Sequence, residues 1–207
     1  RRAKLEPHFQ FMVRVRLPGG VCTPAQWLAL DAAARETANG QLRLTTRQTF
    51  QFHGVFKPSL RRHLQSIAAA GLDTIAACGD DNRNVICNSN PLLSPIHAQV
   101  SALARQISAH LLPRTGAYRE IFLEQPARAS DAEEEPLYGR TYLPRKFKIA
   151  LAVPPQNDVD VFAHDLGFVA IVNEGRLEGF NVLVGGGMGM THKVPTTFPR
   201  LSDVAGF

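Results

Sequence analysis

The sequence has 207 residues, with 44% hydrophobic residues, 20% charged residues and a formal net charge of +5. This composition excludes a disordered or fibrous chain, and a chain of this length can bury a core without disulfides or a structural metal. No segment approaches the run of about 20 apolar residues that crosses a membrane, and residues 1–7 lack the apolar stretch of an export signal, so a cytoplasmic protein without membrane contact is expected.

The chain up to residue 78 alternates between strand and helix patterns. Residues 9–17 place apolar side chains at every second position, which predicts a half-buried strand. Residues 23–39 begin with a capping box and a proline at the first helical position, so they predict a helix. A continuous strand is predicted over 41–56, a helix over 58–71 and a short strand over 74–78. This order indicates an α/β or α+β fold in which helices cover a sheet.

A polar loop at residues 79–84 predicts a boundary between two units, 1–80 and 81–207. The second unit begins with a long helix that Ser94 caps and Pro113 closes. Further along, the sequence predicts a strand over 117–123, an acidic solvated loop over 124–136, a strand over 146–153, a hairpin turn at 173–175 between strands 168–172 and 177–184, and a break at 185–187.

Basic residues gather in the middle of the first unit. Between Glu36 and Asp73 there is no acidic residue, while five basic ones occur: Arg43, Arg47, Lys57, Arg61 and Arg62. In a continuous strand, alternation places one polar row on a single face: Arg43, Thr45, Arg47, Thr49, Gln51 and His53. The rigid fork of arginine matches carboxylates and phosphates, so this row is interpreted as a polyanion-binding face, with a solvent-exposed face as the alternative.

Two shorter basic rows and one arginine complete the set of candidates. Arg14 and Arg16 alternate on the first strand, Lys146 and Lys148 alternate on a later one, and Arg83 lies in the polar loop. If these segments converge, they form a positive cleft in which a lysine has a lowered pKa and donates protons more readily. The alternative for Arg83 alone is an ordinary surface residue. The triple glycine at 185–187 is either a backbone anion nest or a sharp turn.

The three cysteines, Cys22, Cys78 and Cys87, form no C-x-x-C pair. They are too few and too scattered for a disulfide framework, and we expect reduced thiols with no metal ligand among them.

Several short motifs follow one another along almost the whole chain. They are RVRLPGG at 14–20, RLTTRQTFQFHG at 43–54, NRNV at 82–85, SNP at 89–91, LPRT at 112–115, TYLPRKFK at 141–148, PPQND at 154–158, and GFN at 179–181 leading into the triple glycine. Together they resemble the siroheme-dependent sulfite and nitrite reductase family, and within it the hemoprotein (beta) subunits of assimilatory NADPH sulfite reductase.

The resemblance implies a ferredoxin-like half-domain over 1–80 and the first part of a siroheme and [4Fe–4S] reductase domain over 81–207. It implies an oxidoreductase that reduces sulfite to sulfide with six electrons, in sulfate assimilation and cysteine biosynthesis. The residues implied to hold the siroheme carboxylates are Arg43, Arg47, Gln51 and His53. The catalytic residues implied to surround sulfite are Arg14, Arg83, Lys146 and Lys148.

The cluster-ligating cysteines of the family lie beyond the part that this chain matches, and Cys22, Cys78 and Cys87 lack their spacing. The chain is therefore expected to be an N-terminal part of a longer subunit, inactive alone, whose electrons come from NADPH through a flavoprotein (alpha) partner. A siroheme nitrite reductase and a ferredoxin-dependent sulfite reductase are the alternatives within the family. A nucleic-acid or polyanion-binding module is the alternative outside it. It is disfavoured because Phe50 and Phe52 face away from the predicted arginine row, whereas single-strand binders interleave aromatic and basic residues.

Overall fold

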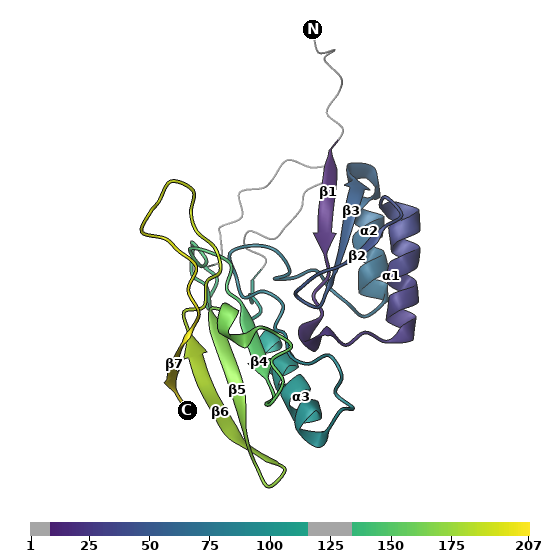
Figure 1. The fold of residues 1–207 in the computed structure, drawn as a ribbon. Helices are drawn as coiled ribbons and strands as arrows, with labels where there is room; N and C mark the ends of the chain where they lie inside the picture. The colour runs from purple at the N-terminus through teal and green to yellow at the C-terminus, as the bar shows by residue number, and fades with distance from the viewer. Residues whose placement is uncertain (1–8, 116–133) are drawn as a thin grey trace.

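The computed structural model describes residues 9–115 and 134–207 (Figure 1). The first unit is an antiparallel sheet in the order β1-β3-β2, formed by Gln10–Arg14, Phe50–Phe56 and Leu42–Leu44. Figure 1 shows helices α1 (Pro24–Thr37) and α2 (Lys57–Ala69) lying together on one side of this sheet. The α/β class predicted from the alternating elements is thereby confirmed.

Apolar alternation and helical spacing build the core of this unit as predicted. The buried core includes Val13, Val15, Leu30, Phe52, Leu60 and Ile67. Helix α1 begins at the predicted capping box: Thr23 Oγ1 accepts from Gln26 N at 3.2 Å, and Gln26 Oε1 accepts from Thr23 N at 3.0 Å. These reciprocal bonds satisfy two backbone donors that a helix N-terminus otherwise leaves unpaired.

The continuous strand predicted over 41–56 is wrong, because the chain reverses at residues 45–49. Thr45 N donates to Thr49 O at 2.9 Å, and Gln48 has a φ of 52°, which closes a hairpin between β2 and β3. Thr49 consequently turns into the core, where its hydroxyl donates to Val15 O. Leu44, which a continuous strand would place with Phe50 and Phe52 on the face opposite the arginines, is 70% exposed.

The strand predicted over 74–78 is also wrong. Only Asp73 forms a bridge, to Arg16, and the chain then turns through Ala76, whose φ is 53°. The Asp73 carboxylate accepts from Ile75 N at 3.0 Å, which favours a turn over a strand. The Asp73 carboxylate also forms an ion pair with Arg16, so the charge of Arg16 is compensated within the first unit.

The second unit is a four-stranded sheet in the order β4-β5-β6-β7, formed by Ile149–Ala152, Leu166–Asn173, Arg176–Val184 and Asp203–Gly206. Strands β4 and β5 are parallel, and the other neighbours are antiparallel. Helix α3 (Pro95–His110) packs its buried Ile96, Val100 and Ala104 in one core with residues of β4. The predicted hairpin at 173–175 is present, with positive φ at Glu174 and Gly175, as tight hairpin turns require.

Two further predictions for this unit have different outcomes. The strand predicted over 117–123 lies outside the described residues, as does most of the acidic stretch over 124–136. Glu135, however, is buried and not solvated. Its carboxylate accepts from Arg114 N at 2.9 Å, from Thr115 N at 2.9 Å and from Leu137 N at 3.1 Å. Hydrogen bonds of this kind offset the cost of burying a charge.

Residues 82–87 connect the two units by running beside β4. Ile86 N donates to Ile149 O at 3.2 Å, and Leu151 N donates to Ile86 O at 2.9 Å. Gly19 N, in the short 3-10 helix Pro18–Gly20 that follows β1, donates to Val85 O at 2.9 Å. Residues 82–87 therefore form backbone hydrogen bonds with both units of the chain. Among the helices of the described residues, none is long and apolar enough to cross a membrane.

Candidate functional site

A cavity of about 300 Å³ lies where the two units meet. It is lined by Arg14, Thr45, Thr46, Arg47, Gln51, Ala77, Arg83, Asn84, Lys146 and Lys148, and we call it the cationic pocket. These residues come from β1, the β2–β3 hairpin, the 77–84 loop and the segment before β4. Segments far apart in the sequence thus place five cations around one space.

The pocket contains most of the residues that the sequence singled out. All four residues implied to surround sulfite line it: Arg14, Arg83, Lys146 and Lys148. Of the four implied to hold siroheme carboxylates, Arg47 and Gln51 line it, while Arg43 and His53 do not. Arg43 is exposed on β2 opposite Gln51, and His53 follows Gln51 by two positions on β3. The hairpin places Arg47 in the turn, away from the strand face that Arg43, Gln51 and His53 share.

Arg14 and Arg83 are held by the same backbone carbonyl. Arg14 Nη1 donates to Ala77 O at 3.0 Å, and Arg83 Nη1 donates to it at 3.1 Å. Arg83 Nε also donates to Gly79 O at 2.8 Å. The turn that replaces the predicted 74–78 strand therefore supplies the acceptors that hold two like charges side by side.

Gln51 links Arg14 to His53. A guanidinium only donates, so the amide oxygen of Gln51 faces Arg14, where it accepts from Nη2 at 2.6 Å and from Nε at 3.0 Å. The amide nitrogen then donates to His53 Nε2 at 3.1 Å. His53 is thereby connected to the cationic pocket through Gln51, although it does not line it.

Lys148 is paired with a carboxylate that sequence reasoning missed. Its Nζ lies 3.5 Å from Asp165 Oδ2, and its backbone N donates to the same oxygen at 2.9 Å. Asp165 follows Lys148 by 17 positions and reaches it because β5 runs parallel to β4. Arg83 also has a carboxylate as a neighbour, since its Nε lies 3.7 Å from Asp81 Oδ1. No local sequence signal indicates the pairing of Lys148 with Asp165.

Burial and mutual repulsion lower the pKa of two cations in the pocket. The pKa of Arg47 is lowered to about 10, mainly by burial, with smaller contributions from the charges of Arg83 and Arg14 against the opposing charge of Asp165. Burial is also the first cause that lowers the pKa of Lys146, followed by the charges of Arg83, Arg145 and Lys148. Arg47 therefore remains protonated at neutral pH, and Lys146 releases a proton more easily than an ordinary lysine does.

Asn84 and Gln48 position the hairpin that carries Arg47. Asn84 accepts from Leu17 N at 2.8 Å, and its amide nitrogen donates to Leu17 O at 2.8 Å and to Arg47 O at 2.9 Å. Gln48 Nε2 donates to Cys87 O at 2.6 Å. Gly20 makes this docking possible, because its φ is 70° and a Cβ on it would lie 2.8 Å from Gln48 Cβ. The sequence motifs contained these amides, but nothing in the sequence indicated what they contact.

The triple glycine packs against the backbone and is absent from the lining of the cationic pocket. A Cβ on Gly186 would lie 2.4 Å from His164 O and 2.5 Å from Phe162 O. Gly185 N donates to Asp165 O at 3.0 Å. Gly186 therefore permits a close approach to residues 162–164, which supports the sharp-turn interpretation.

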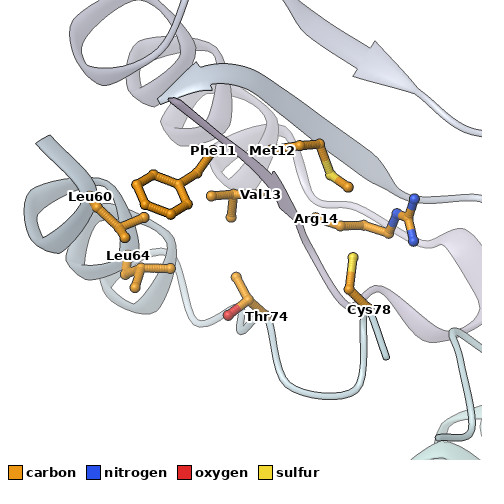
Figure 2. Close-up of a pocket in the computed structure, with 8 residues that line it drawn as sticks. All are labelled: Phe11, Met12, Val13, Arg14, Leu60, Leu64, Thr74 and Cys78. Carbon is orange, nitrogen blue, oxygen red and sulfur yellow. The ribbon is translucent and has the colours of Figure 1, made fainter. Parts of the chain in front are cut away.

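A second, mostly apolar pocket lies beside Arg14 (Figure 2). Figure 2 shows the Arg14 side chain extending away from Phe11, Leu60 and Leu64, with Cys78 on the Arg14 side. This apolar surface lies under the aliphatic part of Arg14, and the guanidinium at its far end reaches the cationic pocket.

The cysteines of the chain are free thiols. Burial raises the pKa of Cys87 to about 11, so this thiol stays protonated at neutral pH. Burial also raises the pKa of Cys22. Within the described ranges, no three His, Cys, Asp or Glu side chains gather in a group that could hold a metal ion.

Two family models match the chain. Residues 2–70 match the nitrite/sulfite reductase ferredoxin-like half domain, and residues 103–206 match the nitrite and sulphite reductase 4Fe-4S domain. The second match alone covers half of the chain.

Curated relatives are similar over the entire chain. The sulfite reductase [NADPH] hemoprotein beta-component of Chromohalobacter salexigens is 66% identical over 213 residues, and that of Anoxybacillus flavithermus is 62% identical over 208. The chain spans 37% and 36% of the length of these two proteins.

Solved structures share the fold. The Mycobacterium tuberculosis NirA protein has a TM-score of 0.65 and 22% identity, covering 94% of this chain and 30% of that one. Dissimilatory sulfite reductase I has a TM-score of 0.59 and 10% identity, covering 95% of this chain and 57% of that one.

Proposed function

The chain belongs to the nitrite and sulfite reductase family, and we propose that it forms the part of an NADPH sulfite reductase hemoprotein that binds sulfite and the siroheme carboxylates. The observation that carries this proposal is the convergence of Arg14, Arg83, Lys146 and Lys148 with Arg47 around one cavity. The similarity to sulfite reductase hemoproteins over the whole chain supports sulfite as the anion. The proposed whole reaction is the six-electron reduction of sulfite to sulfide.

The cationic pocket fits the groups that this reaction needs. In the part of the chain that the structure describes, its lining holds five cations, one amide from each of Gln51 and Asn84, and no carboxylate. Free carboxylates and sulfite are anions that accept several hydrogen bonds, and arginine forks match them in geometry. Cations held close together repel one another, so an anion between them relieves a cost that the empty arrangement carries.

We assign the binding of siroheme carboxylates to Arg47 and Gln51, with Arg43 and His53 next to them. Arg47 is held in a half-buried position, where its donors are less screened by water than on an open surface. Siroheme coupled to a [4Fe–4S] cluster would supply the electrons at the bound anion. The chain contains no C-x-x-C pair, and the cluster ligands are therefore assigned to the remaining length of the subunit.

The four cations Arg14, Arg83, Lys146 and Lys148 have two roles in this proposal. They stabilise the negative charge of sulfite and of the oxyanions formed as oxygen leaves it. Reduction of sulfite to sulfide also consumes protons, which release the oxygens as water. Lys146 is suited to deliver them, because burial and its cationic neighbours lower its pKa.

We further propose that the complete subunit works in the cytoplasm, in sulfate assimilation and cysteine biosynthesis. Its electrons would come from NADPH through a flavoprotein (alpha) subunit. The support for this donor is the similarity to proteins named as NADPH-dependent hemoprotein components.

The test is to substitute Arg47→Ala in the full-length subunit and measure siroheme per protein from visible absorbance. We expect occupancy to fall about tenfold or more, because a hydrogen-bonded charged donor is lost from a partly buried site. Arg62→Ala is the matched control, since Arg62 is an exposed arginine on α2 paired with Glu36. Equal siroheme occupancy in both variants would refute the assignment of the pocket.

A further inference from the structure

His164 lies behind Arg47, at the point where the chain enters β5. Its side chain is buried, with 8% exposure. His164 Nε2 lies 2.9 Å from Val159 O, and His164 Nδ1 lies 3.3 Å from Arg47 Nη2. A carbonyl oxygen only accepts, so Nε2 carries the proton and the lone pair of Nδ1 accepts from the guanidinium.

The guanidinium of Arg47 is therefore held from two separate segments. Besides His164, it is held by Asn84, whose carbonyl oxygen accepts from Arg47 Nη1 at 3.3 Å. Asn84 lies in the segment beside β4, while His164 precedes β5. Two acceptors from different directions define the plane of the guanidinium, which a single acceptor leaves free to rotate.

The backbone around His164 is itself tightly fixed. Gly186 approaches so closely that a Cβ there would lie 2.6 Å from His164 N and 2.4 Å from His164 O. Ser202 N donates to Phe162 O at 2.8 Å from the other side of this segment. The backbone that carries the imidazole is thus fixed in position, and the hydrogen bond to His164 Nδ1 fixes the Arg47 guanidinium in turn.

The charges around His164 favour its neutral form. Burial is the main cause that lowers its pKa, and Arg47 and Lys148 lower it further, while the bond to Val159 and the charge of Asp165 oppose them. These groups come from the β2–β3 hairpin, from the segment before β4 and from the entry to β5. A neutral imidazole can accept from Arg47, whereas a protonated one would repel it.

We infer that His164 is a positioning residue for Arg47. The unprotonated Nδ1 of His164 holds the Arg47 guanidinium in the orientation that faces the anionic groups of the cofactor. This inference rests on the proposed function, because it takes Arg47 to be a donor to siroheme carboxylates. His164 itself does not line the cationic pocket and acts only through Arg47.

The experiment compares His164→Ala and His164→Asn in the full-length holoprotein. The readout is the rate at which siroheme is lost, followed by visible absorbance during dialysis. His164→Ala removes the acceptor, and we expect loss about tenfold faster than in the wild type. His164→Asn offers an amide oxygen near the position of Nδ1, so its rate should stay close to the wild-type rate. His110→Ala, at an exposed histidine of α3, is the matched control and should change nothing.

The pH profile separates positioning from a merely structural effect. Burial lowers the pKa of His164, so its protonation should make the wild type lose siroheme faster only at a pH below the range in which an ordinary histidine titrates. His164→Asn does not titrate there and should show a flatter profile. If His164→Ala fails to fold, this comparison decides alone: parallel profiles of the wild type and His164→Asn would overturn the inference.

The design also separates this inference from the proposed function. If Arg47→Ala loses siroheme while His164→Ala behaves as the wild type, the positioning role is wrong and the proposed function stands. If Arg47→Ala retains siroheme, the proposed function is wrong, whatever the His164 variants show. In the double variant, His164→Ala should add nothing to the loss caused by Arg47→Ala, because His164 acts through that residue.

Discussion

Acceptors within the described residues hold four cations of the pocket: Arg14, Arg47, Arg83 and Lys148. Arg14 and Arg83 share Ala77 O, and Lys148 is paired with Asp165. Ala77 lines the cavity together with the cations, whereas Asp165 does not, so the described lining of the cavity contains no carboxylate. An arrangement of this kind reserves the space between the cations for an external anion.

Lys148 provides the first prediction at the residue scale. Lys148→Ala should leave siroheme occupancy near the wild-type level and lower sulfite turnover about 100-fold or more, because a charged donor to the reacting anion is removed. Siroheme is measured by visible absorbance and turnover by sulfide production. Lys57→Ala, at an exposed lysine where α2 begins, is the control and should keep normal turnover. Normal sulfide production by Lys148→Ala would exclude the role assigned to this lysine.

At the scale of elements, a buried polar contact joins α1 to α2. His63 of α2 is fully buried and lies 2.7 Å from Thr37 Oγ1 of α1. Thr37 donates its hydroxyl proton to Ala33 O, so it accepts from His63 Nδ1. Within the described residues, His63 Nε2 has no hydrogen-bond partner. Protonation of Nε2 would therefore bury an unpaired charge.

This contact predicts a pH-dependent stability. Burial lowers the pKa of His63 to about 4, while an unfolded histidine has a pKa of 6.5. Protons then bind the unfolded chain preferentially, and the free energy of unfolding falls as the pH decreases from 6.5 toward 4. Between pH 7 and pH 5, the wild type should lose about 2 kcal/mol more than His63→Leu does. Urea denaturation at the two pH values measures this difference, and equal losses in both proteins would contradict it.

The elements that the sequence predicted correctly are those set by local patterns. The capping box at Thr23, the helix after Ser94 and the hairpin at 173–175 each depend on residues close together in the chain. The continuous strand over 41–56 failed because alternation alone carries no signal for the reversal at 45–49. That turn is held by distant partners, Cys87 for Gln48 and Val15 for Thr49.

The same distinction applies to the candidate site. Basic rows on the predicted strands singled out Arg14, Arg47, Lys146 and Lys148, the family resemblance added a role for Arg83, and all five line the pocket. The residues that hold them, His164 and Asp165, were missed, because their contacts arise only when β5 pairs with β4. Ion pairs and hydrogen bonds across more than 100 positions, as between Arg47 and His164, leave no periodic trace in a single sequence.

At the scale of the whole molecule, the cationic pocket depends on the docking of two units. The first unit contributes Arg14, Arg47 and Gln51, and the segment that enters the second contributes Lys146 and Lys148. Residues 82–87 bond to both, through Gly19 N to Val85 O and through Ile86 N to Ile149 O. The chain spans little more than a third of its curated relatives, so in the proposal the remainder of the subunit supplies the cluster ligands.

Iron-edge anomalous diffraction from crystals of the full-length holoprotein tests the central claim most directly. We expect anomalous iron density beside the cationic pocket and density for a bound anion in contact with the side chains of Arg14, Arg83, Lys146 and Lys148. Iron located away from this pocket, with the four cations facing only solvent, would contradict it.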